Sequence, residues 1–422
     1  MKLLYDAALV PLRGASYLYG LWPRRTPEAT LERDQRMGRR LPSPPPGALW
    51  IHGASVGEAR IVGALARGVR RLRPALPLVA SSVTRTGRAM IPQEPEVDAA
   101  FFLPLDFRSV QRRAFEALRP GGVVLVETEI WPNLLAEAAA RRVPSCLVNG
   151  RLAPERLSRY RLLGALYGPA LSHLAAVGAA SDAEAARFAA LGVKEGALVV
   201  TGNVKFDLAA PAVDPAPLRA RFGLDARRPV FVAGSTAAGE DPLVLRAFVE
   251  VRRAHPGLFL VLAPRHPERV PGMMERIAAL GLSAHPLSAR DDGKAGRADV
   301  LVVDTLGELA ALYALGAVSF VGGSLVPVGG HNLLEPVAAG SVVVFGPHVG
   351  HVAEVAAALD ACGAGHRVAD PDALASAIAR LIADPDERER RIRAGRDWLV
   401  LHRGALARSV ELVLATLDGS LR

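Results

Sequence analysis

The chain has 422 residues, of which 50% are hydrophobic and 22% are charged; this composition excludes a disordered protein and predicts two folded domains of about 200 residues each. Its 51 lysine and arginine residues against 42 aspartate and glutamate residues give a net charge of +9, which favours anionic partners such as phosphorylated substrates or a phospholipid surface. Aromatic residues make up only 5% and are not interleaved with the arginines, so nucleic acid is not expected as a partner. Cys146 and Cys362 provide neither a disulfide framework nor a cysteine-based zinc site.

The N-terminal segment at residues 3–22 is mostly apolar but is interrupted by Asp6, Pro11 and Arg13, which is unsuitable for a free-standing transmembrane helix. No small-residue cleavage site comes after it, so a secretory signal is not expected. The next residues are rich in arginine: Arg24, Arg25, Arg33, Arg36, Arg39 and Arg40. An apolar segment succeeded by arginines predicts a segment that lies in an anionic membrane surface. The alternative is a helix docked on the first domain.

After a proline-rich spacer at residues 41–46, apolar strands alternate with helices. The predicted strands of the first half occupy residues 48–52, 76–82, 121–127, 145–149, 175–180 and 197–202, and helices are predicted over residues 59–73 and 133–141. Unbroken apolar strands with intervening helices indicate a parallel sheet that is covered on both faces.

Three prolines between residues 207 and 217 break this alternation and predict an interdomain linker. The pattern then restarts, with strands predicted at residues 229–233, 258–263, 299–303, 318–321 and 342–345. The expected fold class is therefore α/β, with two doubly wound Rossmann-like halves that face a central cleft, as in the GT-B architecture. The pattern alone does not separate this from other enzymes with two Rossmann-like domains.

Glycine-rich turns at residues 52–58 and 329–335 each end in a glutamate at a predicted helix start. Such turns bring backbone N–H groups and the positive helix end close to a ligand. The competing interpretation is structural, because Ser, Thr or Asn followed three residues later by Glu forms a helix-capping box. Four such pairs occur: Ser55 and Glu58, Ser181 and Glu184, Thr305 and Glu308, and Asn332 and Glu335. Glu58, Glu308 and Glu335 are the functional candidates, since they follow strands and lie beside glycines.

Glu127 and Glu129 follow the apolar strand at residues 121–127 directly. Carboxylates at the end of a buried strand are costly unless they are solvated, paired or functional, which favours a functional role for Glu127. The alternative is an N-capping turn in which Asn133 starts the helix. Lys205 lies where the first half ends and is predicted either to meet a phosphate or carboxylate group or to pair with Asp207 on the surface.

Arg265 and His266 follow the predicted strand at residues 258–263. An arginine at a strand end is well placed to bind a phosphate through two N–H groups, and His266 either donates to the same group or caps a helix. The two Asp-Pro-Asp sequences, at residues 370–372 and 384–386, are typical of helix starts with proline in the first turn. Neither a metal-ligand spacing nor a P-loop is present in the sequence, so no metal site is predicted.

Six of these motifs, in collinear order, resemble the 3-deoxy-D-manno-octulosonic acid (Kdo) transferases of lipopolysaccharide assembly. They occupy residues 55–58, 127–133, 202–207, 264–269, 305–309 and 322–335. The resemblance implies an inverting GT-B enzyme that takes CMP-Kdo as co-substrate and a lipid A precursor as acceptor, without a metal or other cofactor. It also implies a site of action at the anionic cytoplasmic face of the inner membrane. The interruptions at Asp6 and Arg13 depart from the family pattern.

The resemblance assigns Glu58 as the general base, which takes the proton from the acceptor hydroxyl, and Glu127 and Lys205 as transition-state stabilisers. The residues implied to hold CMP are Arg265, His266, Leu306, Gly307, Glu308, Asn332, Leu333, Leu334 and Glu335. The implied organisation is a membrane-associating segment and spacer (residues 1–46), an acceptor-side domain (47–207), a linker (208–217) and a CMP-sugar domain that includes the C-terminal helices (218–422).

Two other functions fit parts of the pattern. A soluble UDP-sugar epimerase-like enzyme would share the two-domain layout, but it would not need the basic, apolar N-terminus. A non-enzymatic nucleotide-binding protein on the membrane surface would gain nothing from carboxylates such as Glu58 and Glu127 that face a phosphate.

Overall fold

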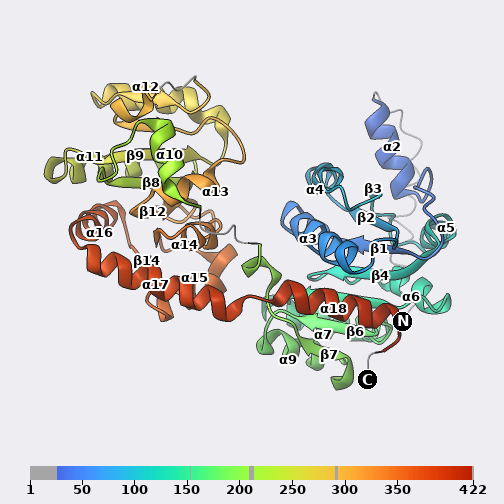
Figure 1. Ribbon diagram of the computed structural model, residues 1–422. Helices are drawn as coiled ribbons and strands as arrows, with labels where there is room; N and C mark the ends of the chain where they lie inside the picture. Colours follow the sequence, from blue (N-terminus) through green and yellow to red (C-terminus); the bar gives the residue numbers. More distant parts are fainter. Residues whose placement is uncertain (1–25, 153, 209–212, 290–292, 421–422) are drawn as a thin grey trace. The chain divides into compact units, whose positions relative to one another are not determined.

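The computed structural model describes residues 26–152, 154–208, 213–289 and 293–420 (Figure 1). The predicted membrane segment at residues 3–22 and the arginines at 24 and 25 lie outside these residues. The chain divides into two compact units, each of which is described by itself. Unit 1 comprises residues 1–208 and 402–422, and unit 2 comprises residues 209–401.

Unit 1 is built on a seven-stranded sheet in the order β3-β2-β1-β4-β5-β6-β7, in which every neighbouring pair is parallel. Its strands are β1 Ala48–His52, β2 Leu78–Ser82, β3 Ala99–Phe102, β4 Pro120–Val126, β5 Ser145–Gly150, β6 Ala176–Ala179 and β7 Leu198–Val200. The first strand therefore lies between β2 and β4, and all five of its residues are buried.

Helices cover both faces of this sheet. They are α2 Pro27–Arg36, α3 Val56–Leu72, α4 Arg85–Met90, α5 Arg108–Leu118, α6 Pro132–Ala140, α7 Pro154–Leu162, α8 Gly164–Leu171, α9 Asp182–Ala190 and α18 Ala405–Leu417, with 3₁₀ turns η1 Ile91–Gln93, η2 Glu195–Ala197 and η3 Val204–Phe206. On one face Trp50 packs in a core with α5, α6, α8 and α9, and on the other Ile51 packs with α3 and α18. Alternate residues of β1 thus pack into two separate hydrophobic cores.

Unit 2 has its own seven-stranded parallel sheet in the order β10-β11-β9-β8-β12-β13-β14. The strands are β8 Val230–Thr236, β9 Phe259–Pro264, β10 Ala284–Pro286, β11 Val300–Val302, β12 Val318–Val321, β13 Val342–Phe345 and β14 Gly365–Arg367. The helices are α10 Pro215–Phe222, α11 Asp241–Ala254, α12 Val270–Ala279, α13 Leu309–Leu312, α14 Leu334–Ala338, α15 Ala353–Ala361, α16 Pro371–Ala383 and α17 Pro385–His402, with 3₁₀ turns η4 Pro267–Arg269, η5 Ala295–Arg297, η6 Tyr313–Leu315 and η7 Gly350–Val352.

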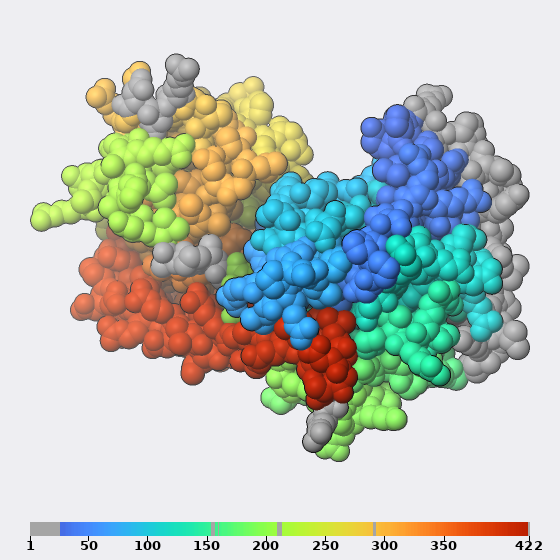
Figure 2. Space-filling view, turned by 45° about the vertical axis from the view of Figure 1, so that its right-hand side comes forward, coloured from blue at the N-terminus to red at the C-terminus, as the bar shows by residue number. Residues whose placement is uncertain are grey.

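The last helix corrects the predicted assignment of all C-terminal helices to the second half. Helix α18 belongs to unit 1, where it completes the core beside α3 (Figures 1 and 2). Its start is held by Asp207, whose carboxylate accepts from the backbone N–H groups of Gly404 and Leu406, each at 2.7 Å. Asp207 therefore anchors the returning chain and does not pair with Lys205, which was one of the two predicted roles of that lysine.

The predicted linker at residues 208–217 also needs correction at its end. Pro215 and Pro217 lie in α10, and the Asp214 side chain accepts from Ala216 N at 2.9 Å to cap that helix. Proline is tolerated in a first helical turn because the N–H groups there have no partner within the helix. The prolines thus mark a helix start as well as the end of the alternating pattern.

Helix α2 is docked on unit 1, and this removes two arginines from the predicted lipid contact. Arg36 donates to Glu32 Oε1 at 3.1 Å and to the carbonyl of Val83 at 2.6 Å, and Arg33 pairs with Asp34 at 3.3 Å. The two arginines that follow the helix, at positions 39 and 40, are exposed. Within the described part of the chain, no helix combines the length and apolar character needed to cross a bilayer.

Candidate functional site

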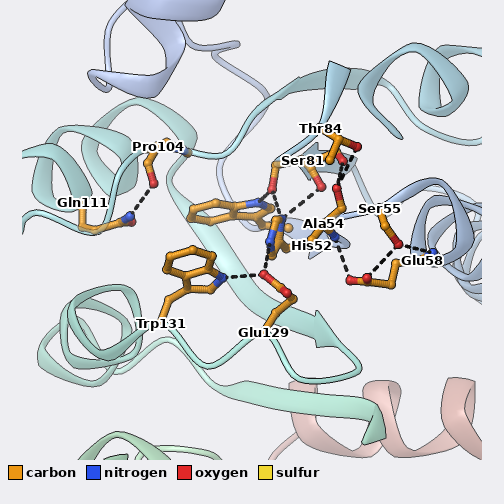
Figure 3. A network of polar contacts seen from close by, with 12 residues as sticks. His52, Ala54, Ser55, Glu58, Ser81, Thr84, Pro104, Gln111, Glu129 and Trp131 are labelled. Carbon is orange, nitrogen blue, oxygen red and sulfur yellow. Dashed lines mark hydrogen bonds and ion pairs between the residues drawn. The ribbon is translucent and has the colours of Figure 1, made fainter. Parts of the chain in front are cut away.

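Glu58 lies in the first turn of α3, immediately after the loop that leaves β1 (Figure 3). Its backbone N–H donates to Ser55 Oγ at 3.4 Å, so Ser55 caps the helix as predicted. The Glu58 carboxylate accepts from the Ser55 hydroxyl at 2.8 Å and from Ala54 N at 2.8 Å. The return bond of the expected capping box therefore goes to Ala54 instead of Ser55. Gly53 makes this closure possible, because a Cβ there would lie 3.0 Å from the Glu58 Cβ and 2.9 Å from Val62.

The environment of Glu58 favours proton uptake. Its side chain is buried, and burial raises the pKa of the carboxyl group above its ordinary value, against the opposing hydrogen bonds from Ala54 and Ser55. The negative charges of Glu127 and Glu129 raise this pKa further. A carboxylate with a raised pKa in the turn that follows a strand is suited to act as a general base.

Glu127 and Lys205, which lie 78 positions apart in the sequence, form an ion pair with Lys205 Nζ 2.6 Å from Glu127 Oε1. Asn149 donates to the same oxygen at 3.4 Å, and its own Oδ1 accepts from Val204 N at 2.9 Å. Glu127 and Asn149 both have left-handed backbones, with φ of 62° and 53°. Asparagine tolerates this region, whereas a glutamate in it is strained, so the Glu127 backbone is an unfavourable conformation at the end of β4.

The alternative role of this segment as a helix cap is not the one found. The α6 start is capped by Asp106, which accepts from Asn133 N at 3.0 Å and from Leu134 N at 2.8 Å. Because Asp106 caps α6, the Glu127 and Glu129 side chains make other contacts.

Glu129 has a partner that sequence reasoning missed. Its Oε2 lies 3.2 Å from Nε2 of His52, the fully buried last residue of β1, and accepts from Trp131 Nε1 at 2.9 Å (Figure 3). The His52 ring also contacts Ser81, at 2.9 Å from Nδ1 to the hydroxyl oxygen. The sequence did contain one signal for His52, because this histidine ends an apolar strand beside a glycine-rich turn. Its partners could not be predicted, since Ser81 and Glu129 are 29 and 77 residues away.

In unit 2, Arg265 and His266 directly follow β9, and both are exposed. The Arg265 backbone is held by a bond from its N–H to Thr236 O at 3.0 Å, and His266 Nδ1 lies 3.5 Å from Glu268. His331, from the loop after β12, is close to them. Burial lowers the pKa of His331, and the charge of Arg265 lowers it further. The lowered pKa favours a neutral His331, so Arg265 supplies the fixed positive charge in this part of unit 2.

Leu306, Gly307 and Glu308 follow β11, the neighbour of β9 in the sheet. The Leu306 residue is 80% exposed, and Gly307 has a φ of 92° that favours glycine. Glu308 lies 3.4 Å from Arg221 and accepts from the Thr305 hydroxyl. No side chain caps α13, so the expected capping box is not formed here.

The segment from Asn332 to Glu335 forms a different turn from the predicted capping box. Asn332 Oδ1 accepts from Leu334 N at 3.1 Å, and Asn332 Nδ2 donates to Glu335 Oε1 at 3.0 Å. Leu333 and Leu334 are buried, so their side chains belong to the interior of unit 2. From this segment, the polar side chains of Asn332 and Glu335 remain for a ligand.

A second residue missed in the sequence is Glu240, which is fully buried before α11. Its carboxylate accepts from four backbone N–H groups at 2.6–3.0 Å; they belong to Ala237, Gly323, Ser324 and Leu325. Glu240 thereby ties the loop after β8 to the loop after β12. No local pattern distinguishes it from an ordinary helix-start glutamate.

The structure thus gathers Glu58, Glu127 and Lys205 beyond the carboxyl ends of the strands in unit 1. In unit 2 it brings Arg265 and His266 near His331, while Glu308 and Glu335 follow strands of the same sheet without contacting them. No cluster of three or more His, Cys, Asp or Glu side chains suited to a metal ion occurs within residues 26–152, 154–208, 213–289 and 293–420.

Comparison with known proteins bears on both halves. The family model described as 3-deoxy-D-manno-octulosonic-acid transferase (kdotransferase) matches residues 31–208. A 3-deoxy-D-manno-octulosonic acid transferase of Bordetella pertussis is 35% identical over 421 residues, covering 95% of this chain and 96% of the relative. Its counterpart from Haemophilus influenzae is 32% identical over 388 residues, covering 89% and 88%.

Solved structures extend the comparison to the fold. A glycosyltransferase from Rickettsia africae has a TM-score of 0.58 and 13% identity, covering 90% of this chain and 100% of that one. The UDP-GlcNAc 2-epimerase of Neisseria meningitidis also has a TM-score of 0.58, with 12% identity over 88% of this chain and 100% of its own. These likenesses confirm the predicted α/β class and GT-B fold, and the sequence relatives decide between the enzymes that share it. The chain belongs to the 3-deoxy-D-manno-octulosonic acid transferase family of glycosyltransferases.

Proposed function

We propose that this enzyme transfers Kdo from CMP-Kdo to a lipid A precursor with inversion at the anomeric carbon, and that Glu58 is the general base. Membership of the Kdo transferase family supports the transferred sugar. The observation that carries the proposal is the buried Glu58 carboxylate, whose pKa is raised by burial and by neighbouring carboxylates. A base of this kind is needed to accept the proton of a sugar hydroxyl.

In the proposed step, the acceptor hydroxyl oxygen forms a bond to the Kdo anomeric carbon while the bond from that carbon to the CMP phosphate oxygen breaks. The hydroxyl proton passes to Glu58, and the electron pair of the broken bond leaves with CMP. Glu58 keeps its hydrogen bonds from Ala54 and Ser55, which orient the carboxylate while it receives the proton. Inversion results from attack opposite the leaving group.

Lys205 supplies a positive charge to the same face. Its ammonium is fixed by Glu127 at 2.6 Å, and its side chain is 37% exposed, so one side remains open to a ligand. We assign Lys205 to the carboxylate of the Kdo unit and Glu127 to holding it there. The strained Glu127 backbone supports this role, because strain of this kind is retained where geometry matters.

We assign the CMP moiety to the strand-end loops of unit 2. The phosphate is expected at Arg265 and His266, and backbone N–H groups at the same sheet edge add to the positive potential. The Glu335 and Glu308 carboxylates are suited to accept hydrogen bonds from the ribose hydroxyls, and exposed Leu306 offers an apolar surface to the base. In this proposal cationic side chains take the charge of the leaving phosphate, so activity should persist in EDTA. Loss in EDTA that magnesium restores would contradict that part.

The proposed acceptor is a membrane lipid, which places the enzyme at the anionic cytoplasmic face of the inner membrane. Exposed Arg39 and the net charge of +9 support contact with anionic head groups. Deleting residues 1–22 should reduce binding to anionic vesicles and slow turnover on membrane-embedded acceptor, with activity on detergent-dispersed acceptor largely spared. Unchanged vesicle binding would show that this segment is not a membrane anchor.

The deciding experiment measures CMP release and the Kdo-bearing lipid product from CMP-Kdo and a lipid A precursor. The proposal expects both in equal amounts, and neither when the acceptor is omitted. Interconversion of a UDP-sugar without a lipid acceptor would instead favour the epimerase-like alternative. Binding of CMP-Kdo without turnover would favour a non-enzymatic nucleotide-binding protein.

A further inference from the structure

Beneath the Glu58 site, a chain of polar side chains runs from the core of unit 1 to Glu129. Trp50 Nε1 donates to Ser81 Oγ at 2.7 Å, Ser81 Oγ lies 2.9 Å from His52 Nδ1, and His52 Nε2 lies 3.2 Å from Glu129 Oε2. Three of these four residues are fully buried, and Glu129 lies at the surface end (Figure 3). The proposed transfer step does not use this chain.

The buried end of the chain has a fixed orientation. The Trp50 ring packs against Phe101 and Phe115, with ring centroids 5.7 and 5.8 Å away. The packing fixes the direction of the Trp50 N–H, and Ser81 Oγ accepts the hydrogen bond from it. Ser81 is left with its own O–H to donate, and His52 Nδ1 lies within reach.

These hydrogen bonds then determine which nitrogen of His52 carries a proton. If Ser81 donates to Nδ1, the neutral ring carries its proton on Nε2, which donates to Glu129. If Nδ1 instead donates to the Ser81 carbonyl, at 3.1 Å, a neutral ring would turn an unprotonated Nε2 toward the Glu129 carboxylate. Two acceptors cannot face each other at that distance without cost, so only a doubly protonated ring fits the second case. With Glu129 ionised, both arrangements place a proton on Nε2.

Glu129 Oε2 consequently receives two N–H donors, from His52 and Trp131, which suits a carboxylate. Oε1 has no partner among the described residues. His52, which contacts Glu129, and Ala54, whose N–H donates to Glu58, are two positions apart at the end of β1, so both carboxylates are held at the same turn (Figure 3). The other negative neighbour of Glu58 is Glu127, which Lys205 pairs.

Helix α4 also packs at this turn, since a Cβ on Gly87 would lie 3.2 Å from the Ser55 carbonyl carbon. Its arginines are turned elsewhere: Arg85 donates to Glu32 at 2.7 Å, and the Arg88 guanidinium lies 6.0 Å from the Phe102 ring centroid. Arg60, the next charged residue on α3, is exposed. Glu129 is therefore the negative neighbour of Glu58 that has no cationic ion-pair partner of fixed charge among the described residues.

We propose that Trp50, Ser81 and His52 form a positioning device that holds the Glu129 carboxylate at the turn that carries Glu58, so that the negative charge of Glu129 stays close to the Glu58 carboxylate. Glu129 and His52 are positioning residues in this proposal, because neither is required to touch the reacting atoms. The consequence for turnover rests on the proposed role of Glu58 as the base.

The test is a ¹³C NMR titration of the full-length protein with labelled glutamate carboxyl groups. The Glu58 signal is assigned by its absence in Glu58→Gln. Glu129→Gln should lower the Glu58 titration midpoint by about 0.5 to 1 pH unit, because one negative neighbour is removed. Glu137→Gln, on α6, is the matched control: its side chain is 21% exposed against 19% for Glu129, and it should leave the midpoint unchanged.

His52 is tested by a pair of variants. His52→Leu removes both ring nitrogens and should move the Glu58 midpoint in the same direction as Glu129→Gln, whereas His52→Gln retains an N–H donor toward Glu129 and should restore part of the shift. If His52→Leu does not fold, Trp131→Phe, which removes the other donor to Glu129, takes its place in the test. The acid limb of kcat/KM should move with the NMR midpoint.

An unchanged Glu58 midpoint in Glu129→Gln would overturn the proposal, as would a shift of equal size in Glu137→Gln. This readout is independent of turnover. If Glu58→Gln retained normal turnover, the assignment of Glu58 as base would fail, while the titration would still decide whether Glu129 sets the charge state of Glu58.

Discussion

Units 1 and 2 both place their first strand inside a seven-stranded parallel sheet, with the second strand on one side, yet the loops at their strand ends carry different charged residues. Unit 1 gathers three carboxylates there, from Glu58, Glu127 and Glu129. Unit 2 presents Arg265 and His266, with His331 close by. The fold determines where ligands approach, and the loop residues decide whether that edge accepts protons or attracts anions.

The two units also differ in how they use a buried glutamate. Glu58 accepts from one backbone N–H group and one hydroxyl and keeps the capacity to take a proton. Glu240 accepts hydrogen bonds from four backbone N–H groups, and these bonds join two loops. Burial alone therefore does not distinguish the two glutamates; the number of hydrogen bonds that each carboxylate already accepts does.

The largest expected effect comes from Glu58→Gln. Loss of the general base should lower kcat by about 10²- to 10⁴-fold while folding persists, because the amide oxygen can still accept from Ala54 N. Glu184→Gln is a close control, since Glu184 also follows a capping serine on the same unit and accepts from the backbone N–H of Leu152 at 2.6 Å. CMP release and thermal unfolding are measured for both. If turnover fell equally in the two variants, Glu58 would have no catalytic role that Glu184 lacks.

Glu240→Gln tests the opposite side of the comparison. A glutamine offers one oxygen, so its NH₂ group would face backbone N–H donors in a fully buried position. We expect a loss of about 2 to 4 kcal/mol in the free energy of unfolding of unit 2, measured by urea denaturation. Glu250→Gln, exposed on the same α11 helix, should cost less than about 0.5 kcal/mol. If Glu240→Gln left the free energy of unfolding unchanged, the two loops would be held together by other contacts.

Lys205→Met is expected to have an intermediate effect on catalysis. It removes the cation assigned to the Kdo carboxylate and leaves Glu127 without its 2.6 Å partner. Turnover should fall by about 10- to 100-fold, the worth of one charge-assisted interaction. Lys194→Met, an exposed lysine of the same unit, should change nothing. If both variants kept normal kcat and KM, Lys205 would be an ordinary surface residue.

The smallest effect concerns stability and pH. Burial holds the pKa of Glu58 above its ordinary 4.5, so the folded protein binds this proton more tightly than the unfolded chain does. The resulting stabilisation is complete below pH 4.5 and is lost as the pH rises through the raised pKa. The stability of Glu58→Gln relative to the wild type should therefore increase from pH 4.5 toward neutral pH and then level off. A difference that is constant with pH would contradict the raised pKa.

Local patterns predicted the central strands closely, and β1, β12 and β13 have the predicted bounds. The strands that were missed are the edge strands β3, β10 and β14, which are short and only partly buried, so they lack a continuous apolar run. Helix α18 was misplaced because its partner surface lies more than three hundred positions earlier in the chain, as in the Arg73–Asp418 ion pair with a separation of 345.

The candidate site shows the same division. Glu58 and Glu127 could be proposed from the sequence because each follows a strand closely in a distinctive local sequence. His52 was missed because its role depends on Ser81 and Glu129, which only the sheet brings together. Contacts of this kind arise from tertiary pairing and leave no local periodicity to read.

The proposed mechanism depends most on Glu58 being the group whose ionisation drives transfer. The direct measurement is single-turnover CMP release against pH, with saturating CMP-Kdo and lipid A precursor, for the wild type and Glu58→Gln. The wild-type rate should rise with the ionisation of one group whose pKa lies above 4.5, and the residual rate of Glu58→Gln should lack this rise. The same pH dependence in both proteins would contradict the mechanism.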